Sequence, residues 1–541
     1  MIAVSFDEAR DLDDDRRSAL LGAKGAGLVS LRDEAPIPDG FVLTTDAGRH
    51  RRAHGWDDRL EGAFTRHLAD LERRGSTRVG GGTGHGPLLV GVRSAGTSSM
   101  PGALRTILNV GATPEAIDAL AGIGGRTFAA DTLARAERSW ADATETPRPS
   151  DPVDQVRRAI QVVFDATPTW GSAPSGTRPA AAGARGTTGL AAPAELSEPA
   201  ELAVIVQTMV FGNRDDRSAT GAIVSRDPVT GAPGVVGSVV VTGQGPDVMS
   251  GTSTTESFDV LVERWPDAGA ELVAIAARAE RRFRDMVELE FTIESGRLWI
   301  LQCRPSMRSA AAARRVAVDL AEAPTFPLTR AEAVDRVAHL ITSSPPAIRT
   351  EVAGEVAVDA TPARASRRVV IARGEPASPG QASGVLVTDP DEALRRGDAG
   401  EAVVLARPET TPADMNAIGA SVALFATRGG LVSHAAVVAR AWGIPAVVGA
   451  RDAVVDTAGV STDAHTVPVG AVVTIDGSAG TLSLGAPPPA ESAGPSDPSD
   501  ASDAVLRRWA ASGPAGRPAD QVTGAGGTAH RPDRGSNPEP A

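Results

Sequence analysis

The spacing of hydrophobic residues predicts a mixed fold for the first 300 residues. Short apolar runs typical of strands are separated by glycine-rich turns and by stretches with helical spacing. The clearest runs read GPLLVGVRS, ELAVIVQTMVF, GVVGSVVVTGQG and LEFTIESGRLWILQCRP. We therefore predict an α+β domain over residues 1–305.

After this domain, the spacing of apolar residues becomes typical of helices. Residues 307–323 are rich in alanine and repeat apolar positions at helical spacing. Thr329 and Glu332 form a Thr-x-x-Glu capping box at the start of a second helical run. Two helices followed by a proline-containing linker are expected over residues 306–368.

A second, smaller domain is predicted over residues 369–485. Its β-branched runs EAVVLARP, VALFATRGG and AVVTIDGSAGTLSL alternate with helical segments, which makes the chain as a whole an α+β and α/β multidomain protein. Two stretches rich in small residues and proline lack any such period. Residues 172–196 are expected to be a mobile insertion, and residues 486–541 a disordered tail with at most a transient helix at DAVLRRWAA.

Composition narrows the classes of function. The 541 residues carry a net charge of −13, which argues against a general nucleic-acid or anionic-membrane binder because such proteins need clustered positive charge. A single cysteine, Cys303, rules out an intrachain disulfide or a cysteine-rich zinc site. No basic-then-apolar signal pattern opens the chain and no apolar run reaches about 18 residues, so the sequence predicts a cytoplasmic protein.

The basic residues of the chain include a single lysine. Lys24, in the stretch LLGAKGAGLVSL, is the single lysine among 54 lysines and arginines. Arginine spreads its charge over a planar fork, whereas lysine offers a compact ammonium, so a retained lysine is typical of a phosphate site that needs a point charge. The alternative is that coding bias removed the other lysines and left this one by chance.

A histidine occupies a position suited to phosphoryl transfer. His434, within TRGGLVSHAAVVARAWGIPAVVG, lies where a glycine-bearing loop meets an apolar helical run. The start of a helix is rich in amide donors that can hold a phosphoryl group, and a neutral imidazole is a nucleophile. From the local residues alone, a histidine with a purely structural role at the helix start is the preferred interpretation.

Three oxygen-bearing side chains are candidates for a magnesium site. Glu288 and Glu290 are two residues apart on a predicted strand and so share a face, and Gln302 lies on the next strand. Carboxylate and amide oxygens suit Mg²⁺, which also bridges nucleotide phosphates. The alternating glutamates could equally form the solvated face of an edge strand.

These motifs together resemble a known family. The stretch around His434 is similar to the phosphohistidine signature of enzymes that interconvert phosphoenolpyruvate and pyruvate. GAKGAGLVSL, VRSAGTSSMPGALRTILNVG, VQTMVFGNRDDRSATGAIVSRDPVTG and ELEFTIESGRLWILQCRP resemble, in order, the ATP-grasp nucleotide domain of pyruvate phosphate dikinase. The resemblance implies an ATP-grasp domain, a helical linker and a swivelling β/β/α phosphohistidine domain.

The resemblance also implies roles for individual residues. His434 would carry the phosphoryl group, with Lys24 and Arg93 as ATP phosphate ligands and catalytic partners. The other nucleotide contacts would be a closing loop with Ser99, Met100 and Gly102, an adenine-side strand with Gln207, Met209 and Val210, and finally Glu290 and Gln302. Glu288, Glu290 and Gln302 would bind Mg²⁺, although the family usually has aspartate at the first of these positions.

Several departures from the family pattern accompany the resemblance, which covers roughly residues 15–485. Val432 stands where many dikinases carry a regulatory threonine, and SGTSTT at 250–255 replaces an arginine-containing segment. After Gly485 the chain has no room for the family's phosphoenolpyruvate/pyruvate barrel, which needs about 250 residues.

The expected function is the nucleotide half-reaction of a dikinase: ATP and phosphate give AMP, pyrophosphate and phosphorylated His434. Pyruvate and phosphoenolpyruvate chemistry would be missing or supplied by a separate barrel-containing chain. The alternative is a degenerate ATP-binding regulatory or interaction protein without turnover. A third reading, an antibiotic phosphotransferase similar to the rifampicin-modifying enzyme, is disfavoured because residues 306–368 are too few for an acceptor domain. The final acceptor, the choice of phosphate or water as co-substrate, and the oligomeric state stay open.

Overall fold

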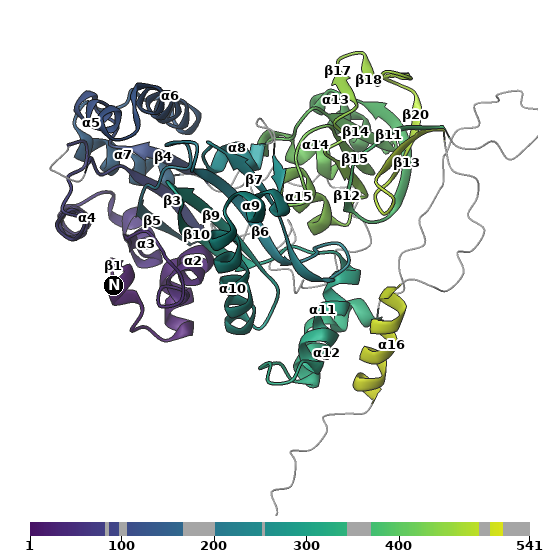
Figure 1. Ribbon diagram of the computed structural model, residues 1–541, viewed down its shortest axis with the longest axis horizontal. Helices are drawn as coiled ribbons and strands as arrows, with labels where there is room; N and C mark the ends of the chain where they lie inside the picture. Colours follow the sequence, from purple (N-terminus) through teal and green to yellow (C-terminus); the bar gives the residue numbers. More distant parts are fainter. Residues whose placement is uncertain are drawn as a thin grey trace, which may run out of the picture.

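The computed structural model describes residues 1–81, 86–96, 105–165, 201–250, 255–342, 369–485 and 498–511. These residues form a mixed α/β protein of several sheets, as the hydrophobic pattern predicts (Figure 1). The expected insertion at 172–196 and most of the expected linker, residues 343–368, lie outside the described ranges. No described helix is both long enough and apolar enough to cross a membrane.

The first sheet is antiparallel and follows the order β1-β2-β5-β3-β4. Its strands are β1 (Ala3–Ser5), β2 (Gly40–Leu43), β3 (Val90–Gly96), β4 (Thr106–Val110) and β5 (Leu202–Thr208). Helices of the same part of the chain are α1 (Phe6–Ala9), α2 (Asp14–Ser30), α3 (Thr45–His54), α4 (Asp58–Gly75), α5 (Pro114–Gly124), α6 (Arg126–Ala143) and α7 (Pro152–Phe164). Buried side chains from α4 and α7 pack against this sheet, which gives it a core of its own.

The second sheet is also antiparallel and follows the order β10-β9-β6-β7-β8. Its strands are β6 (Ala219–Arg226), β7 (Pro233–Val241), β8 (Glu256–Ser257), β9 (Val287–Glu294) and β10 (Arg297–Pro305). The helices beside it are α8 (Gly245–Ser250), α9 (Phe258–Arg264) and α10 (Pro266–Phe283). Three of the four apolar runs singled out in the sequence correspond to β3, β5 and β7, and the fourth spans the hairpin β9–β10.

A helical cluster follows the second sheet. The two predicted helices are α11 (Ala310–Glu322) and α12 (Arg330–Thr342). The predicted capping box is present, because the Glu332 amide donates to Thr329 Oγ1 at 3.2 Å and the Thr329 amide donates to Glu332 Oε2 at 2.9 Å. The capping carboxyl of Glu332 also accepts from Arg284, which with the box lowers its pKa to about 2.

The C-terminal helix differs from the sequence expectation. Residues predicted to form at most a transient helix in a disordered tail form α16 (Pro498–Ala511), which packs on α11 and α12 (Figure 1). Leu506 is fully buried in this cluster, and the Arg330 guanidinium lies 5.1 Å from the ring centroid of Trp509. The few apolar residues of α16 lie where helical spacing can bury them together, which an average composition does not reveal.

Residues 369–485 fold around a third sheet of order β11-β21-β20-β13-β14-β15-β16-β12, in which β13 to β16 run parallel. Its strands are β11 (Val370–Arg373), β12 (Glu375–Ser378), β13 (Gln381–Val387), β14 (Val403–Arg407), β15 (Ala423–Ala426), β16 (Ala446–Val448), β20 (Val472–Asp476) and β21 (Thr481–Leu484). The accompanying elements are the helices α13 (Pro390–Asp398), η2 (Pro412–Asp414), α14 (Met415–Gly419) and α15 (His434–Trp442) and the strands β17 (Val454–Asp456), β18 (Gly459–Ser461) and β19 (Thr466–Pro468). We call these residues the C-terminal region.

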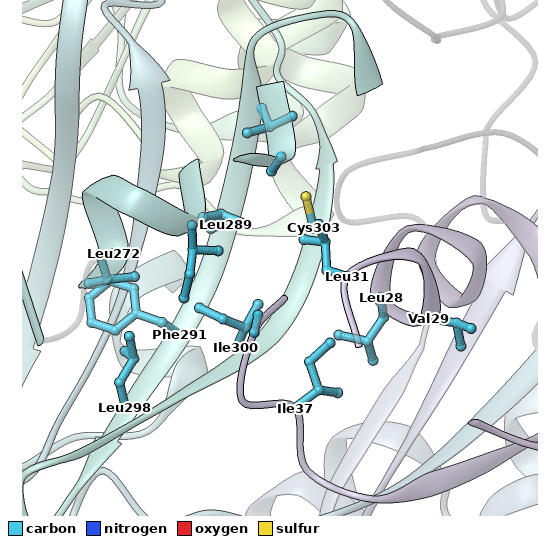
Figure 2. Packing of buried hydrophobic residues seen from close by; sticks show 14 of the residues in the cluster. Leu28, Val29, Leu31, Ile37, Leu272, Leu289, Phe291, Leu298, Ile300 and Cys303 are labelled. Carbon is cyan, nitrogen blue, oxygen red and sulfur yellow. The ribbon is translucent and has the colours of Figure 1, made fainter. Parts of the chain in front are cut away.

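Helix α2 joins the two N-terminal sheets. Leu28 and Leu31 pack with residues of β9 and β10 such as Leu289 and Ile300 (Figure 2). A Cβ added at Gly27 would lie 2.3 Å from the carbonyl oxygen of Cys303, so only glycine lets the helix come this close to β10. Gly22, with φ of 66°, provides a kink at which the helix passes β3. The glycines around Lys24 therefore hold this part of α2 against both sheets.

We predict that Gly27→Ala lowers the thermal denaturation midpoint, because the new methyl group must push α2 away from the β10 backbone. Overpacking of this kind costs about 1–3 kcal/mol. Gly62→Ala in α4 is the matched control, since its added Cβ meets nothing within 4 Å and alanine is the better helix former. A midpoint for Gly27→Ala at or above that of Gly62→Ala would contradict this view of the α2 packing.

Candidate functional site

The second sheet has two chemically different faces. One face carries Leu289, Phe291 and Ile293 of β9 into the apolar core. The opposite face carries Glu288 and Glu290 of β9, and the strand register places them beside Val224 and Ala222 of β6. This second face is called the site face below.

A bulge in the β9–β10 hairpin determines which β10 residues reach the site face. The register shifts between Ile300 and Gln302, so that Gln302 pairs with Glu290 and Arg304 pairs with Glu288. Without that shift Leu301 would be the residue opposite Glu290. The bulge therefore places a polar pair of residues, rather than apolar ones, next to the two glutamates.

A cavity of about 210 Å³ lies between the first and second sheets, in front of the site face. Lys24 from α2 and Arg93 from β3 line it on one side, and Glu290 and Gln302 line it on the other. Arg93 Nη1 lies 3.8 Å from Glu290 Oε2, and Gln302 Nε2 donates to Glu290 Oε1 at 3.1 Å. The fold thus brings four of the sequence-predicted residues to one cavity.

The cavity continues into a narrower pocket. Arg93, Leu108 and Leu301 line both spaces. Gln207, Met209 and Val210, at the end of β5 and just after it, line only the narrow end. The site therefore has a wide end with Lys24 and Glu290 and a narrow end that mixes apolar and uncharged polar side chains with Arg93, a division suited to a ligand with an anionic part and a flat part that carries hydrogen-bonding groups.

Three sequence-predicted residues of the closing loop, Ser99, Met100 and Gly102, lie outside the described residues. The same holds for most of the altered segment 250–255. The site is therefore built here from α2, the two sheets and α8, whose Gly245 and Val248 also line the cavity.

The electrostatics of Lys24 follow from its position between the sheets. Burial lowers the pKa of Lys24 to about 8, and the positive charges of Arg304 and Arg93 act in the same direction. Glu290 and Glu288 oppose this shift by attracting the ammonium. An anion entering the cavity would add its own attraction for the ammonium and so favour the charged form of Lys24.

Glu288 differs from its predicted role. It is buried, and its Oε1 accepts from Arg304 Nη2 at 2.7 Å. It does not line the cavity, whereas Glu290 and Gln302 do. Within the part of the chain that the structure describes, no group of three or more histidine, cysteine, aspartate or glutamate side chains could hold a metal by itself. Of the three predicted metal ligands, Glu290 and Gln302 present oxygens at the cavity, and Glu288 is engaged by the arginine.

His434 is the first residue of α15 and is buried, with 5% of its surface exposed. Burial lowers the pKa of its imidazole, which the charge of Asp414 partly offsets, so the ring is held in its neutral form near pH 7. Neither ring nitrogen, nor the hydroxyl of the preceding Ser433, has a hydrogen-bond partner among the described residues. A buried imidazole with two free nitrogens at a helix start can act as a nucleophile.

The loop before His434 is held from two sides. Arg440 Nη2 donates to the carbonyl of Leu431 at 2.6 Å and its Nη1 donates to that of Ala377 at 2.9 Å. Glu375, whose pKa is raised by burial, accepts a hydrogen bond from the Leu431 amide. Burial lowers the pKa of Arg440 to about 10, against the attraction of Glu288 and Asp227 from the N-terminal half. Gly430 of the histidine loop lies close to Ser238 of β7, so the loop is next to the second sheet, and α15 lies beside β7 in Figure 1.

Comparison with known proteins identifies the family. A family model described as "Pyruvate phosphate dikinase, AMP/ATP-binding domain" matches residues 53–267 and 267–323. A second, described as "PEP-utilising enzyme, mobile domain", matches residues 399–480, which include His434. The chain belongs to the pyruvate phosphate dikinase family of phosphoenolpyruvate-utilising enzymes.

Curated relatives agree with this assignment. Pyruvate, phosphate dikinase of Rhizobium meliloti (strain 1021) is 33% identical over 536 residues, which cover 86% of this chain and 56% of the relative. The Clostridium symbiosum protein of the same name is 31% identical over 526 residues, with the same coverage of each chain. Pyruvate, phosphate dikinase 1, chloroplastic, of Arabidopsis thaliana is 30% identical over 513 residues, covering 84% of this chain and 49% of the relative. The chain thus spans about half the length of the curated relatives it matches.

Two features of the site were not predicted from the sequence. Arg304, which holds Glu288, follows Gln302 by two residues, and that spacing on a strand could have placed it on the same face. Arg440 lies six residues after His434 in a run read only as an apolar helix. An arginine within such a run was the signal of a buried contact.

The pKa of Lys24 gives a direct prediction. Because Lys24 is the single lysine of the chain, selective isotope labelling of lysine yields one side-chain resonance for NMR. We expect that resonance to titrate with a midpoint near the predicted pKa of about 8 in the nucleotide-free protein. A midpoint near the ordinary lysine value of about 10.4 would place Lys24 in solvent instead.

Proposed function

We propose that the N-terminal half is an ATP-grasp module that phosphorylates His434, and that the C-terminal region is the swivelling domain that carries the phosphoryl group. A ring nitrogen of His434 would attack the β-phosphorus of ATP and take the β,γ-diphosphoryl group, as the bond between the β-phosphorus and the α,β-bridging oxygen breaks and AMP leaves with that oxygen. Inorganic phosphate would then take the terminal phosphoryl group as pyrophosphate and leave phosphorylated His434. This is the nucleotide half-reaction expected of a dikinase.

The observation that carries the proposal is the shared site face. The β9–β10 part of this face borders the cavity, which is surrounded by Lys24, Arg93, Glu290 and Gln302. The His434 loop packs on the β6–β7 part of the same face. Phosphoryl transfer catalysed by positioning needs the donor phosphorus and the attacking atom held in a defined relative geometry. The cavity and the family match to an AMP/ATP-binding domain support ATP as the donor.

The charged side chains suit the phosphates of ATP. Lys24 supplies a compact charge, and Arg93 can bind two phosphate oxygens with its planar guanidinium. The narrow end, with Gln207, Met209 and Val210, would take the adenine. Both cations stabilise negative charge that develops on the phosphoryl oxygens during transfer.

Magnesium fits this donor set in part. Glu290 and Gln302 would hold Mg²⁺ through one carboxylate and one amide oxygen, and a magnesium ion usually completes its shell with phosphate oxygens and water. When bound, the ion would supply positive charge that offsets the negative charge of the phosphates. Glu288 would act indirectly, by fixing Arg304 beside the site.

The state of His434 supports its role as nucleophile. Its lowered pKa keeps the imidazole neutral, and its unpartnered nitrogens leave a lone pair available for attack on phosphorus. The helix start behind it would stabilise the phosphorylated product through its backbone amides.

A labelling experiment tests the proposed function. The full chain is incubated with ATP labelled at the β-phosphorus, Mg²⁺ and phosphate, and acid-labile label on the protein is measured together with AMP. We expect label on His434, and none in His434→Asn, which keeps the shape of the imidazole site approximately. ATP binding without AMP formation in the parent chain would instead establish the non-catalytic alternative.

Lys24→Arg should fold normally but lose activity. The substitution keeps the charge, yet the wider guanidinium displaces the phosphates from their alignment with His434. We expect the rate of His434 labelling to fall by at least about a hundredfold, the scale of a misplaced catalytic contact. Arg52→Lys on α3 is the reciprocal control, because Arg52 is exposed and away from the cavity. Labelling of Lys24→Arg at the parent rate would show that Lys24 is a compositional accident.

A further inference from the structure

The site face has an apolar part that the nucleotide cavity does not use. On β6 and β7 this face carries Val224, Val236 and Val240, beside the polar part on β9 and β10. Val248 of α8 belongs to the same buried cluster and also lines the cavity. An exposed apolar surface of this kind next to a ligand site normally contacts another element of protein.

Val432 is the residue of the C-terminal region that joins the apolar cluster on this part of the site face. It is 1% exposed, although it lies on the loop two residues before His434. Its buried cluster is the one that contains Val224, Val240 and Val248, all from the N-terminal half. Neither of the two apolar clusters inside the C-terminal region includes it, whereas the neighbouring Ala435 belongs to one of them.

Two further contacts join the same surfaces. A Cβ added at Gly430 would lie 2.6 Å from Ser238 Oγ of β7, so the glycine brings the loop backbone close to the sheet. Arg451 Nη2 donates to the carbonyl oxygen of Thr255 at 2.9 Å across the same boundary. A buried valine and a close backbone approach thus seat the histidine loop against the second sheet, and the Arg451 hydrogen bond separately joins the C-terminal region to the residue before β8.

We infer that Val432 is the anchor that docks the His434 loop on the apolar part of the site face, and that it acts as a positioning residue for phosphorylation. The buried cluster that Val432 joins includes Ala222, Val224, Val240 and Val248, together with residues of α11, α12 and α16. Because Val432 contributes to this interface and to no apolar cluster within its own region, its side chain stabilises the docked arrangement specifically. The inference deepens the proposed function, but docking itself can be measured without any reaction.

Docking and the nucleotide site are joined by shared residues. Ala222 and Val248 belong both to the docking surface and to the cavity wall. Seating of Val432 therefore ties the position of His434, two residues later, to residues that also line the cavity. A change at Val432 alters how often His434 is in place, without touching the phosphate ligands.

The test is an interdomain distance measured by single-molecule fluorescence transfer in the full chain. Dyes are attached at Val273→Cys on α10 and Leu484→Cys on β21, both exposed positions, while the native Cys303 is fully buried. Val432→Asp places a charge in the apolar seat and should lower the docking equilibrium constant by at least about a hundredfold. We expect a low-transfer population to appear in this variant.

Val454→Asp is the matched control, because Val454 is 61% exposed in the same region and its change should leave the transfer histogram as in the parent. Val432→Asp giving that same parental histogram would overturn the inference. If Val432→Asp loses its folding transition, the nearly isosteric Val432→Thr decides, with a docking constant about tenfold below the parent expected and an unchanged one contradicting the inference.

The labelling assay then separates this inference from the proposed function. If both hold, the rate of His434 labelling falls in proportion to the docked fraction. If no variant, including the parent, acquires label but the histograms shift as expected, the docking anchor stands and the proposed reaction does not. A parental labelling rate in a variant that is mostly undocked would show that Val432 does not position His434.

Discussion

The close packing of α2 on the backbone of β10 is the constraint on which the site depends. Gly27 lies so near the carbonyl of Cys303 that any side chain would separate the helix from the sheet. Lys24 lies less than one turn before it and is therefore held between the two sheets rather than in solvent. The lowered pKa of its ammonium is a consequence of that burial. A single packing contact thus sets both the position of Lys24 and the pKa of its ammonium.

The second sheet gives the molecule its functional asymmetry. Its core face is uniformly apolar, and its site face changes from polar on β9 and β10 to apolar on β6 and β7. The polar half borders the cavity, whereas the apolar half receives the loop before His434. Because strand pairing fixes the distance between these halves, the sheet itself sets the geometry between the cavity and the histidine loop.

Much of this arrangement could be predicted from local sequence, and the reason differs between elements. The apolar runs predicted strands because burial on a sheet needs such runs, and the capping box of Thr329 and Glu332 predicted a helix start because its hydrogen bonds are local. The shared face of Glu288 and Glu290 followed from the strand period. Each of these three predictions depends on interactions between residues that are close together in the sequence.

Other features depend on distant pairings that no local pattern contains. The contact between Glu288 and Arg304 arises from the bulge after Ile300, and a regular hairpin would have given Glu288 a different neighbour. The helix α16 forms where α11 and α12 provide a surface for Leu506, although its surroundings in the sequence are polar and rich in small residues. The burial of Val432 likewise requires a partner surface from more than 180 residues earlier in the chain.

The central claim is that the cavity around Lys24 binds the phosphates of ATP. The most direct measurement is the titration of the single lysine resonance in the presence of saturating ATP and Mg²⁺. Phosphate oxygens beside the ammonium favour its charged form, so the account predicts that nucleotide raises the pKa of Lys24 well above its nucleotide-free value of about 8. A resonance whose chemical shift and midpoint stay unchanged when nucleotide is bound would contradict the account.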